Sequence, residues 1–283
     1  MKRRIAIIGV GLIGGSLGLA LKKRNLAEEI IGVGHRQESL DQAMRMGAVD
    51  RVTLEWEEGV KAVDLVVIAT PVSLIPGMVG DMSRVLSPGA IITDVGSTKE
   101  KIVEEIDKVI PEGIYFVGGH PLAGSEKRGV GEAKADLFEN NVCVLTPGKK
   151  TSFEVVETIK SLWEGVGAKV LVMKPEEHDF LIAVTSHLPH LIATTLVNLA
   201  SEVAGEDERL VSLIANGFKD TTRIAASSPE LWRDIFLSNK NNLVAMIDRF
   251  KGLLEEAKEH ISQEEGVLLQ KDFAKAKTFR DKI

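Results

Sequence analysis

A histidine near the middle of the chain has the surroundings expected of a reactive group. His120 lies in the stretch GGHPLAG, just after an apolar run that we interpret as a strand. Glycine and proline on both sides are typical of an open, turn-like backbone, so we expect His120 on a loop rather than in a packed core. An imidazole is a good proton acceptor near neutral pH. His120 is therefore the predicted catalytic base.

Two more polar side chains could bind a substrate, one after a predicted strand and one in the helical half of the chain. Ser97 follows another predicted strand, and its hydroxyl could hold a substrate group or cap a helix that begins near Lys99; both roles can coexist. Arg223, flanked by Ile224 and Ala225, is expected to be partly buried and so to need an anionic partner. That partner is either Asp220, three residues earlier on the same helical face, or a substrate carboxylate. A charge-assisted hydrogen bond to such a carboxylate contributes roughly 1.5–3 kcal/mol.

A pair of histidines lies in the second half of the chain. His187 and His190 are three residues apart, a spacing that could suggest a metal site. Pro189 separates them, and the other candidate ligands nearby are His178 and Asp179. We therefore expect no metal ion here.

The start of the chain indicates a nucleotide site that could serve these residues. The run IAIIGVGLIGGS could belong to a secretory leader, but its glycines would each cost a continuous helix about 1 kcal/mol relative to alanine. A strand that ends at Gly9 and a helix that opens near Gly14 fit better. Gly9, Gly11 and Gly14 then form the dinucleotide fingerprint, in which Gly9 makes the turn, Gly11 admits the pyrophosphate and Gly14 allows close packing.

Other cofactor contacts follow from this placement. The first helical amides, at Leu12 and Ile13, would face the phosphates with the positive end of the helix dipole. Thr70 and Pro71 follow another strand and would line the cofactor, unless they form an ordinary turn. After the second strand the chain has Arg36 and no acid, which favours NADP over NAD unless Arg36 is only a solvated residue.

The pattern of elements predicts an α/β Rossmann-like doubly wound sheet followed by an all-α helical dimerisation domain. We expect a dinucleotide-binding domain over 1–173 and a helical substrate and dimerisation domain over 174–283, acting as a homodimer. The predicted strands are 4–8, 29–33, 65–69, 90–94, 115–117, 142–146 and 169–172.

Composition narrows the class of protein. A net charge of −6 without a lysine or arginine block makes nucleic acid an unexpected partner. The apolar stretch 180–200 is long enough for a membrane span, but its histidines, proline and hydroxyl residues fit a buried helix better, so no membrane is expected. The single cysteine, Cys143, fits a reducing cytoplasm and is interpreted as a small buried residue in a strand.

Together these motifs resemble the prephenate/arogenate dehydrogenase family of tyrosine biosynthesis, over nearly the whole chain and in the same order. The matching motifs are Gly9-x-Gly11-x-x-Gly14-Gly15-Ser16, Asp94-x-Gly96-Ser97-x-Lys99, Gly119-His120-Pro121-x-Ala123-Gly124, Ser186-His187-Leu188-Pro189-His190, Phe218-x-Asp220-x-Thr222-Arg223-Ile224-Ala225 and Trp232-x-Asp234.

This resemblance implies oxidative decarboxylation of prephenate, or of arogenate, with hydride transfer to NAD(P)+. His120 would accept the proton of the C4 hydroxyl, and Ser97 would orient that hydroxyl and the nicotinamide. Arg223 would bind a carboxylate, with His190 and His187 in the same substrate pocket, a cleft between the two domains. We see no room for a chorismate mutase fusion or a regulatory domain, so any inhibition by tyrosine is expected to act in that pocket.

Two other classes of protein remain possible from the sequence. One is another two-domain NAD(P)-dependent dehydrogenase for hydroxyacids or imines, although those families usually place a catalytic lysine in the helical half. The other is a nucleotide-sensing protein without turnover. The joint presence of His120, Ser97 and Arg223 favours the enzyme.

Overall fold

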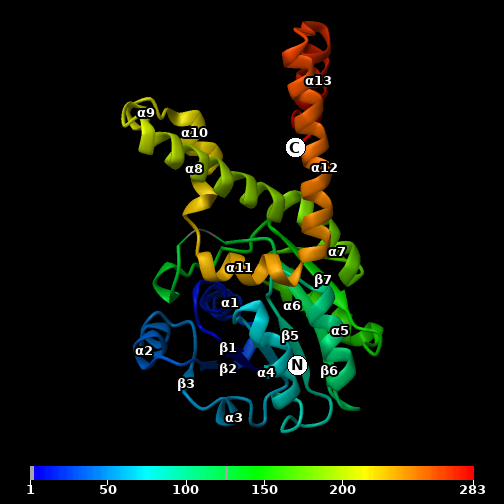
Figure 1. Cartoon of the computed structure of the whole chain (residues 1–283). Helices are drawn as coiled ribbons and strands as arrows, with labels where there is room; N and C mark the ends of the chain where they lie inside the picture. Colours follow the sequence, from blue (N-terminus) through cyan, green and yellow to red (C-terminus); the bar gives the residue numbers. More distant parts are fainter. Residues whose placement is uncertain (1–2, 125–126) are drawn as a thin grey trace. The chain divides into compact units, whose positions relative to one another are not determined.

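Residues 3–124 and 127–283 are described by the computed structural model. The chain forms two compact units, the first ending at Asn239 and the second running from Lys240 to Ile283. The helices between Pro175 and Ser238 belong to the first compact unit, so the boundary between the compact units lies later in the chain than the predicted domain boundary at 173/174. Figure 1 shows the elements of both units along the chain.

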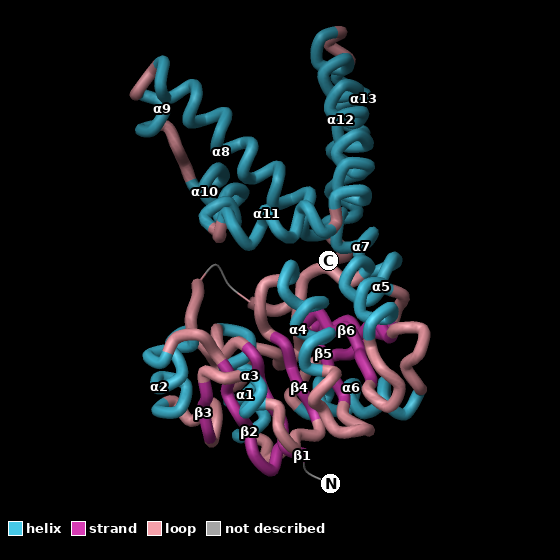
Figure 2. Tube along the Cα trace, turned by 60° about the horizontal axis from the view of Figure 1, so that its bottom comes forward, coloured by secondary structure: helices cyan, strands magenta, loops and turns pink. Residues whose placement is uncertain are grey.

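The first unit contains a twisted sheet, drawn in magenta in Figure 2. Within the described ranges, eight strands form one sheet in the order β3-β2-β1-β4-β5-β6-β7-β8. The strands are β1 (Arg3–Ile8), β2 (Ala27–Val33), β3 (Arg51–Thr53), β4 (Leu65–Ile68), β5 (Ile91–Asp94), β6 (Tyr115–Pro121), β7 (Val142–Pro147) and β8 (Lys169–Val172). All neighbouring pairs are parallel except β6 and β7. The predicted doubly wound sheet is confirmed.

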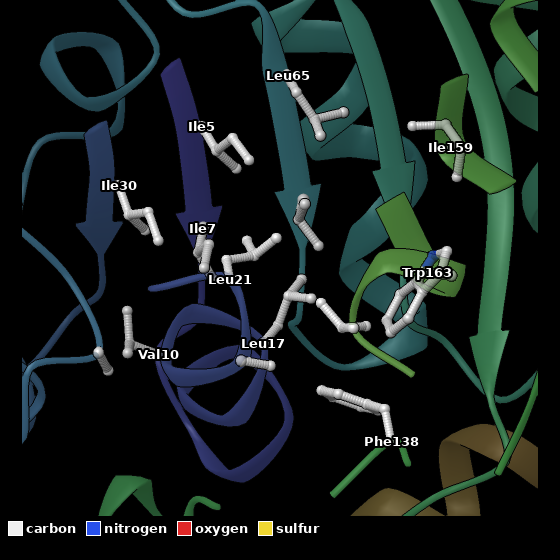
Figure 3. Packing of buried hydrophobic residues seen from close by; sticks show 14 of the residues in the cluster. Ile5, Ile7, Val10, Leu17, Leu21, Ile30, Leu65, Phe138, Ile159 and Trp163 are labelled. Atoms are coloured by element: carbon white, nitrogen blue, oxygen red, sulfur yellow. The ribbon is translucent and has the colours of Figure 1, made fainter. Parts of the chain in front are cut away.

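Helices cover both faces of this sheet. Those that accompany the strands are α1 (Leu12–Lys23), α2 (Gln37–Arg45), α3 (Trp56–Gly59), α4 (Ile75–Met82), α5 (Glu100–Val109) and α6 (Phe153–Gly165), with short 3-10 turns η1 (Val72–Leu74) and η2 (Val130–Glu132). Alternate residues of β1 face opposite sides: Ile5 and Ile7 pack with α1 and α6, as Figure 3 shows, whereas Ala6 and Ile8 join the core beneath α4 and α5. Because both faces are buried, the strands consist of almost continuous apolar residues.

The helical segment that follows the sheet contains α7 (Pro175–Ile182), a π-helical turn η3 (Ala183–His187), α8 (Leu188–Glu206), α9 (Arg209–Ser212), α10 (Asn216–Thr222), the 3-10 turn η4 (Arg223–Ala226) and α11 (Pro229–Ser238). α7 packs against α5, and α11 packs against η1. Ile235 of α11 reaches the core beneath α4. These contacts join the helical segment to the nucleotide-binding half.

The second unit consists of α12 (Lys240–Ser262) and α13 (Gly266–Arg280), which pack against each other. The periodic stripe predicted for the last long helix lies on α12. Its outer members Leu253 and Leu254 are more than half exposed in the single chain, so this unit presents uncovered apolar side chains.

Two strands differ from the prediction. β3 was missed because it has only three residues, Arg51–Thr53, with a single clearly apolar one. β6 was predicted to end at Val117 but continues through Gly118, Gly119 and His120 to Pro121, where it pairs antiparallel with β7. Glycine and proline usually interrupt strands, so the sequence favoured a loop.

Other expectations can be compared directly. Cys143, predicted as a small buried residue, lies fully buried in β7, and burial raises the pKa of its thiol. The stretch Pro175–Glu206 is long and apolar enough to cross a membrane by length and composition, and 28% of its most apolar window is buried. A π-helical turn interrupts it, and several of its histidines are buried within the chain.

The close packing at the first turn of α1 predicts that a larger residue there destabilises the protein. A Cβ on Gly14 would lie 2.3 Å from the carbonyl oxygen of Gly9, a backbone atom that cannot move away cheaply. We expect Gly14→Ala to destabilise the protein by about 1–3 kcal/mol and to lower Tm by about 3–10 °C. Thermal unfolding without cofactor measures this.

Gly77 provides the control, since a Cβ there meets no atom within 4 Å. Gly77→Ala should leave Tm unchanged or raise it slightly, because alanine is the better helix former. Equal stability of Gly14→Ala and the unchanged protein would contradict the close packing described for this turn.

Candidate active site

The predicted site residues of the sheet meet at one of its edges. β1, β4, β5 and β6 run parallel in adjacent positions, so their carboxyl ends lie together. The strand order reverses between β1 and β4, and ligands bind at such a switch point in open α/β sheets. Gly9 follows β1, Thr70 follows β4, Ser97 follows β5, and His120 lies near the end of β6.

The turn from β1 to α1 has the geometry of a phosphate cradle. Gly9 has a φ of 95°, which favours glycine, and its N–H donates to the carbonyl of Val33. Gly11 caps α1 with no side-chain hydrogen bond, and a Cβ at Gly11 would meet no atom within 4 Å. The first N–H groups of α1, at Leu12 and Ile13, follow Gly11 at the positive end of the helix dipole. These features fit a dinucleotide.

The other predicted cofactor residues border this turn. The Thr70 hydroxyl lies 3.5 Å from the sulfur of Met78, and Pro71 is exposed just before η1. Arg36 is exposed at the N-terminus of α2, after β2. Exposure and position alone do not tie Arg36 to a particular cofactor group, so its role stays a prediction.

The predicted loop position of His120 is wrong: this histidine lies inside β6, opposite Val144 of β7, and is only 9% exposed. The two glycines before it make this possible. A Cβ on Gly118 would lie 2.4 Å from Thr146 Oγ1, and one on Gly119 would lie 2.6 Å from the carbonyl oxygen of Asp94. The glycines thus allow β6 to pack closely against its neighbours.

A buried ion pair fixes the same part of β6. Lys99 and Asp94 are both fully buried and paired, and Lys99 Nζ also donates to the carbonyl of Gly119 at 2.9 Å. The Asp94 carboxylate accepts from the N–H groups of Gly119, at 3.0 Å, and Gly96, at 2.8 Å. The pair is therefore hydrogen-bonded on both sides, as a buried ion pair requires. It holds the strand that carries His120.

Behind His120, two residues of α7 continue a hydrogen-bonded chain. His120 Nδ1 lies 2.8 Å from His178 Nε2, and His178 Nδ1 lies 2.7 Å from Asp179 Oδ1. The Asp179 carboxylate also accepts from the backbone N–H groups of Lys99, at 2.7 Å, and Glu100, at 3.0 Å. Asp179 thus caps α5 from another helix, a role that had been considered for Ser97.

The other two histidines of the helical segment, His187 and His190, lie beside this hydrogen-bonded chain. Asn239 Nδ2 donates to the carbonyl of Asp179, at 2.7 Å, and to His187 Nδ1, at 3.1 Å. His187 then carries its proton on Nε2, a buried atom with no hydrogen-bond partner among the described residues. His190 stacks on Trp232, with ring centroids 3.5 Å apart and an interplanar angle of 12°. His187 therefore presents an N–H donor that no described residue accepts from.

Ser97 and Arg223 have less defined surroundings. Ser97 is half-buried between β5 and α5, and its hydroxyl makes no hydrogen bond to any residue that the structure describes. Arg223 begins η4, which packs against α8, the helix of His190. The prediction that Arg223 is partly buried is wrong, because its side chain is exposed in the single chain. Burial of Ile224 and Ala225 is itself only partial, so these neighbours do not cover the guanidinium.

Three histidines at this edge, His120, His187 and His190, are held neutral. Burial, followed by the positive charge available on His178, Lys99 and His187, keeps the pKa of His120 well below its usual value. Burial also lowers the pKa of His187 and of His190 to about 4. At neutral pH His120 is therefore an unprotonated imidazole, which can accept a proton from a substrate hydroxyl.

The sequence analysis missed several residues of this site. Lys99 appears in the sequence motifs and at a predicted helix start but has no predicted site role, His178 and Asp179 appear only as rejected metal ligands, and Asn239 does not appear. Among residues 3–124 and 127–283, no cluster of three or more side chains could hold a metal ion. The available signal was the adjacent pair His178-Asp179, which lies shortly before the motif that contains His187 and His190.

Comparisons with known proteins extend over both halves of the chain. A family model described as prephenate dehydrogenase, nucleotide-binding domain, matches residues 17–172, and one described as prephenate dehydrogenase, dimerization domain, matches residues 174–275. The prephenate dehydrogenase of Bacillus subtilis is 41% identical over 99% of this chain and 76% of its own length.

Solved structures agree with these matches. The prephenate dehydrogenase of A. aeolicus, solved with hydroxyphenyl propionate and NAD+, has a TM-score of 0.93 and 36% identity, covering 100% of this chain and 98% of its own. A Synechocystis arogenate dehydrogenase has a TM-score of 0.84 and 30% identity, covering 99% of each chain. Both substrates thus occur among similar proteins.

The neutral histidines predict a pH dependence of stability. Between about pH 4 and 6.5 an unfolded chain protonates His187 while the folded chain does not, so the unfolded state binds more protons and stability falls as pH falls through this range. Each such histidine contributes up to roughly 1.4 kcal/mol per pH unit. His187→Asn should reduce the slope of the unfolding free energy by up to that amount. Urea unfolding between about pH 5 and 6.5 measures it.

His35→Asn serves as the matched control, because His35 is exposed. An unchanged slope is expected for this variant. If His187→Asn and His35→Asn gave the same slope as the unchanged protein, a neutral buried His187 would be excluded.

Proposed function

The chain belongs to the prephenate dehydrogenase family and is a dehydrogenase, and on that premise we propose that it catalyses the NAD(P)+-dependent oxidative decarboxylation of prephenate to 4-hydroxyphenylpyruvate. Arogenate, which would give tyrosine, is the second candidate substrate, since a similar arogenate dehydrogenase shares the fold over 99% of both chains. The observation that carries the proposal is the buried, unprotonated His120 at the carboxyl edge of the sheet, beside the glycine turn.

The proposed division of labour follows the two halves of the chain. Residues 1–173 bind the dinucleotide through Gly9, Gly11 and Gly14 and through the amides of Leu12 and Ile13. Residues 174–283 supply substrate contacts and the contacts of a homodimer. The apolar side chains exposed on α12 support a partner copy, and the lone cysteine supports a reducing, cytoplasmic setting.

Bound to that turn, the nicotinamide would supply the acceptor for the hydride from C4 of the substrate. His120 accepts the proton of the C4 hydroxyl, and Ser97 orients that hydroxyl. The electron pair of the bond to the ring carboxylate then enters the ring, CO2 leaves and the ring becomes aromatic. Aromatisation makes the reaction effectively irreversible.

Recognition of the dianionic substrate requires donors on the helical side. Arg223 is proposed to bind one carboxylate, and the Nε2–H of His187 provides a neutral donor without an acceptor in the part of the chain that the structure describes. His190, held flat against Trp232, lines the same pocket. The place of Arg223 at the start of η4, which packs against the helix of His190, supports this role.

These roles separate in steady-state kinetics. His120→Asn should lower kcat by about 100- to 10,000-fold with little change in KM, whereas Arg223→Gln should mainly raise KM, by roughly 10- to 100-fold. Rates are measured with prephenate and with arogenate from the absorbance of the reduced nicotinamide. Arg209→Gln, which removes an exposed arginine paired with Asp207, is the control and should change neither constant. The opposite split would reverse the two assignments, and turnover of neither substrate would refute the proposal.

Cofactor choice is proposed to favour NADP+, through the exposed Arg36 and the absence of an acid beside it. Arg36→Gln should then lower kcat/KM with NADP+ about tenfold, equivalent to roughly 1.4 kcal/mol, and leave kcat/KM with NAD+ nearly unchanged. Arg45→Gln removes another exposed arginine, at the end of α2, and should affect neither. A parallel loss with both cofactors would show that Arg36 does not read the 2′-phosphate.

A further inference from the structure

Asp179 is held by donors from two directions. The backbone N–H groups of Lys99 and Glu100, at the N-terminus of α5, donate to its two carboxylate oxygens. Such a position favours an ionised carboxylate, because the helix dipole and both N–H groups stabilise negative charge. An ionised carboxylate only accepts hydrogen bonds. The contact of 2.7 Å with His178 must therefore be donated by His178 Nδ1.

This donation determines the proton positions on the next ring. A neutral imidazole carries one proton, so His178 with Nδ1–H has a bare Nε2 that accepts. The partner of that Nε2, at 2.8 Å, is His120 Nδ1. His120 Nδ1 must donate, and the proton of the neutral His120 ring is then on Nδ1. The atom left without a proton is His120 Nε2.

We propose that His178 and Asp179 are positioning residues that hold His120 in its Nδ1–H form, so that Nε2 is the proton-accepting atom. The inference rests on the proposed function only in the step that gives Nε2 a substrate hydroxyl. Neither residue needs to touch the substrate. Both lie on α7, so the helical segment sets the protonation state of a group on the sheet.

The same chain accounts for the charge that forms when His120 accepts a proton. The titratable groups around His120 are His178 of α7, His187 of η3, Lys99 before α5 and Cys143 of β7, and Asp94 at the end of β5 is paired with Lys99. Asp94 is already engaged by Lys99 and by two backbone N–H groups. Asp179, reached through His178, is therefore the carboxylate that offsets the positive charge on the protonated His120. The Nδ1 proton of His120 can shift toward His178 Nε2 and spread this charge over two rings.

The first test reads proton positions and requires no turnover. The chain has six histidines, so ¹⁵N-edited NMR of the whole protein can assign His120 by comparison with His120→Asn. We expect Nδ1 of His120 to show the shift of a protonated nitrogen and Nε2 that of a bare one. His178→Leu, which removes the acceptor, should abolish this pattern, and His178→Gln, whose amide oxygen can accept from His120, should preserve it. A proton on Nε2 in the unchanged protein, or the same pattern in His178→Leu, would overturn the inference.

The second test concerns kinetics. His178→Leu should lower kcat by roughly 100-fold or more and leave KM for the substrate within about threefold, and His178→Gln should recover most of the rate. The control is His260→Leu, which removes another histidine–aspartate pair, with Asp272 at 3.1 Å, from α12. It should leave both constants unchanged. Equal rates for the Leu and Gln variants would reduce His178 to a packing role.

The two tests separate this inference from the proposed function. A His178-dependent Nδ1–H on His120 in a protein that oxidises neither prephenate nor arogenate would support the inference and refute the function. Turnover with the proton on Nε2 of His120 would do the reverse.

Discussion

The buried pair of Lys99 and Asp94 is the interaction on which the site depends. It lies where β5 ends and α5 begins, and it binds the backbone of β6 at Gly119 on both sides, immediately before His120. Removing one member would leave the other charge buried without a partner, at a cost of about 3–5 kcal/mol. These charges therefore fix the strand that carries His120, and Gly118 and Gly119 leave room for close packing there.

A second aspartate joins the helical segment to this frame. Asp179 reaches from α7 to the first turn of α5 and satisfies N–H groups that no residue of α5 itself caps. The neighbouring Asn239 binds the carbonyl of Asp179 and also His187. Four polar residues of the helical segment, His178, Asp179, His187 and Asn239, thus form one buried network with the carboxyl edge of the sheet. This explains why the first compact unit extends well past the last strand.

Local pattern was sufficient for much of the fold and part of the site. The glycine turn, the order of sheet and helices, and the choice of His120 followed from short motifs whose geometry is local. The parallel register, by contrast, depends on neighbours distant in sequence, as does the extension of β6, where glycine favoured a loop until its packing against Asp94 and Thr146 is known. The hydrogen-bonded chain from Asp179 through His178 to His120 is likewise tertiary, since His120 lies 58 positions before His178. The exposure of Arg223 also depends on how the helices pack and has no signal in the local pattern.

The π-helical turn at Ala183–His187 limits which insertions and deletions the helical segment can accept during evolution. A wider turn accommodates an extra residue within a helix, and every residue after it is rotated by about 100° relative to an uninterrupted α-helix. His178 and Asp179 lie before the turn, whereas His187 and His190 lie at its end or after it. Loss of a single codon in this stretch would therefore turn His187 and His190 away from His178 and Asp179, although all four residues would still be present. Alignments that tolerate gaps here would be aligning proteins with different pockets.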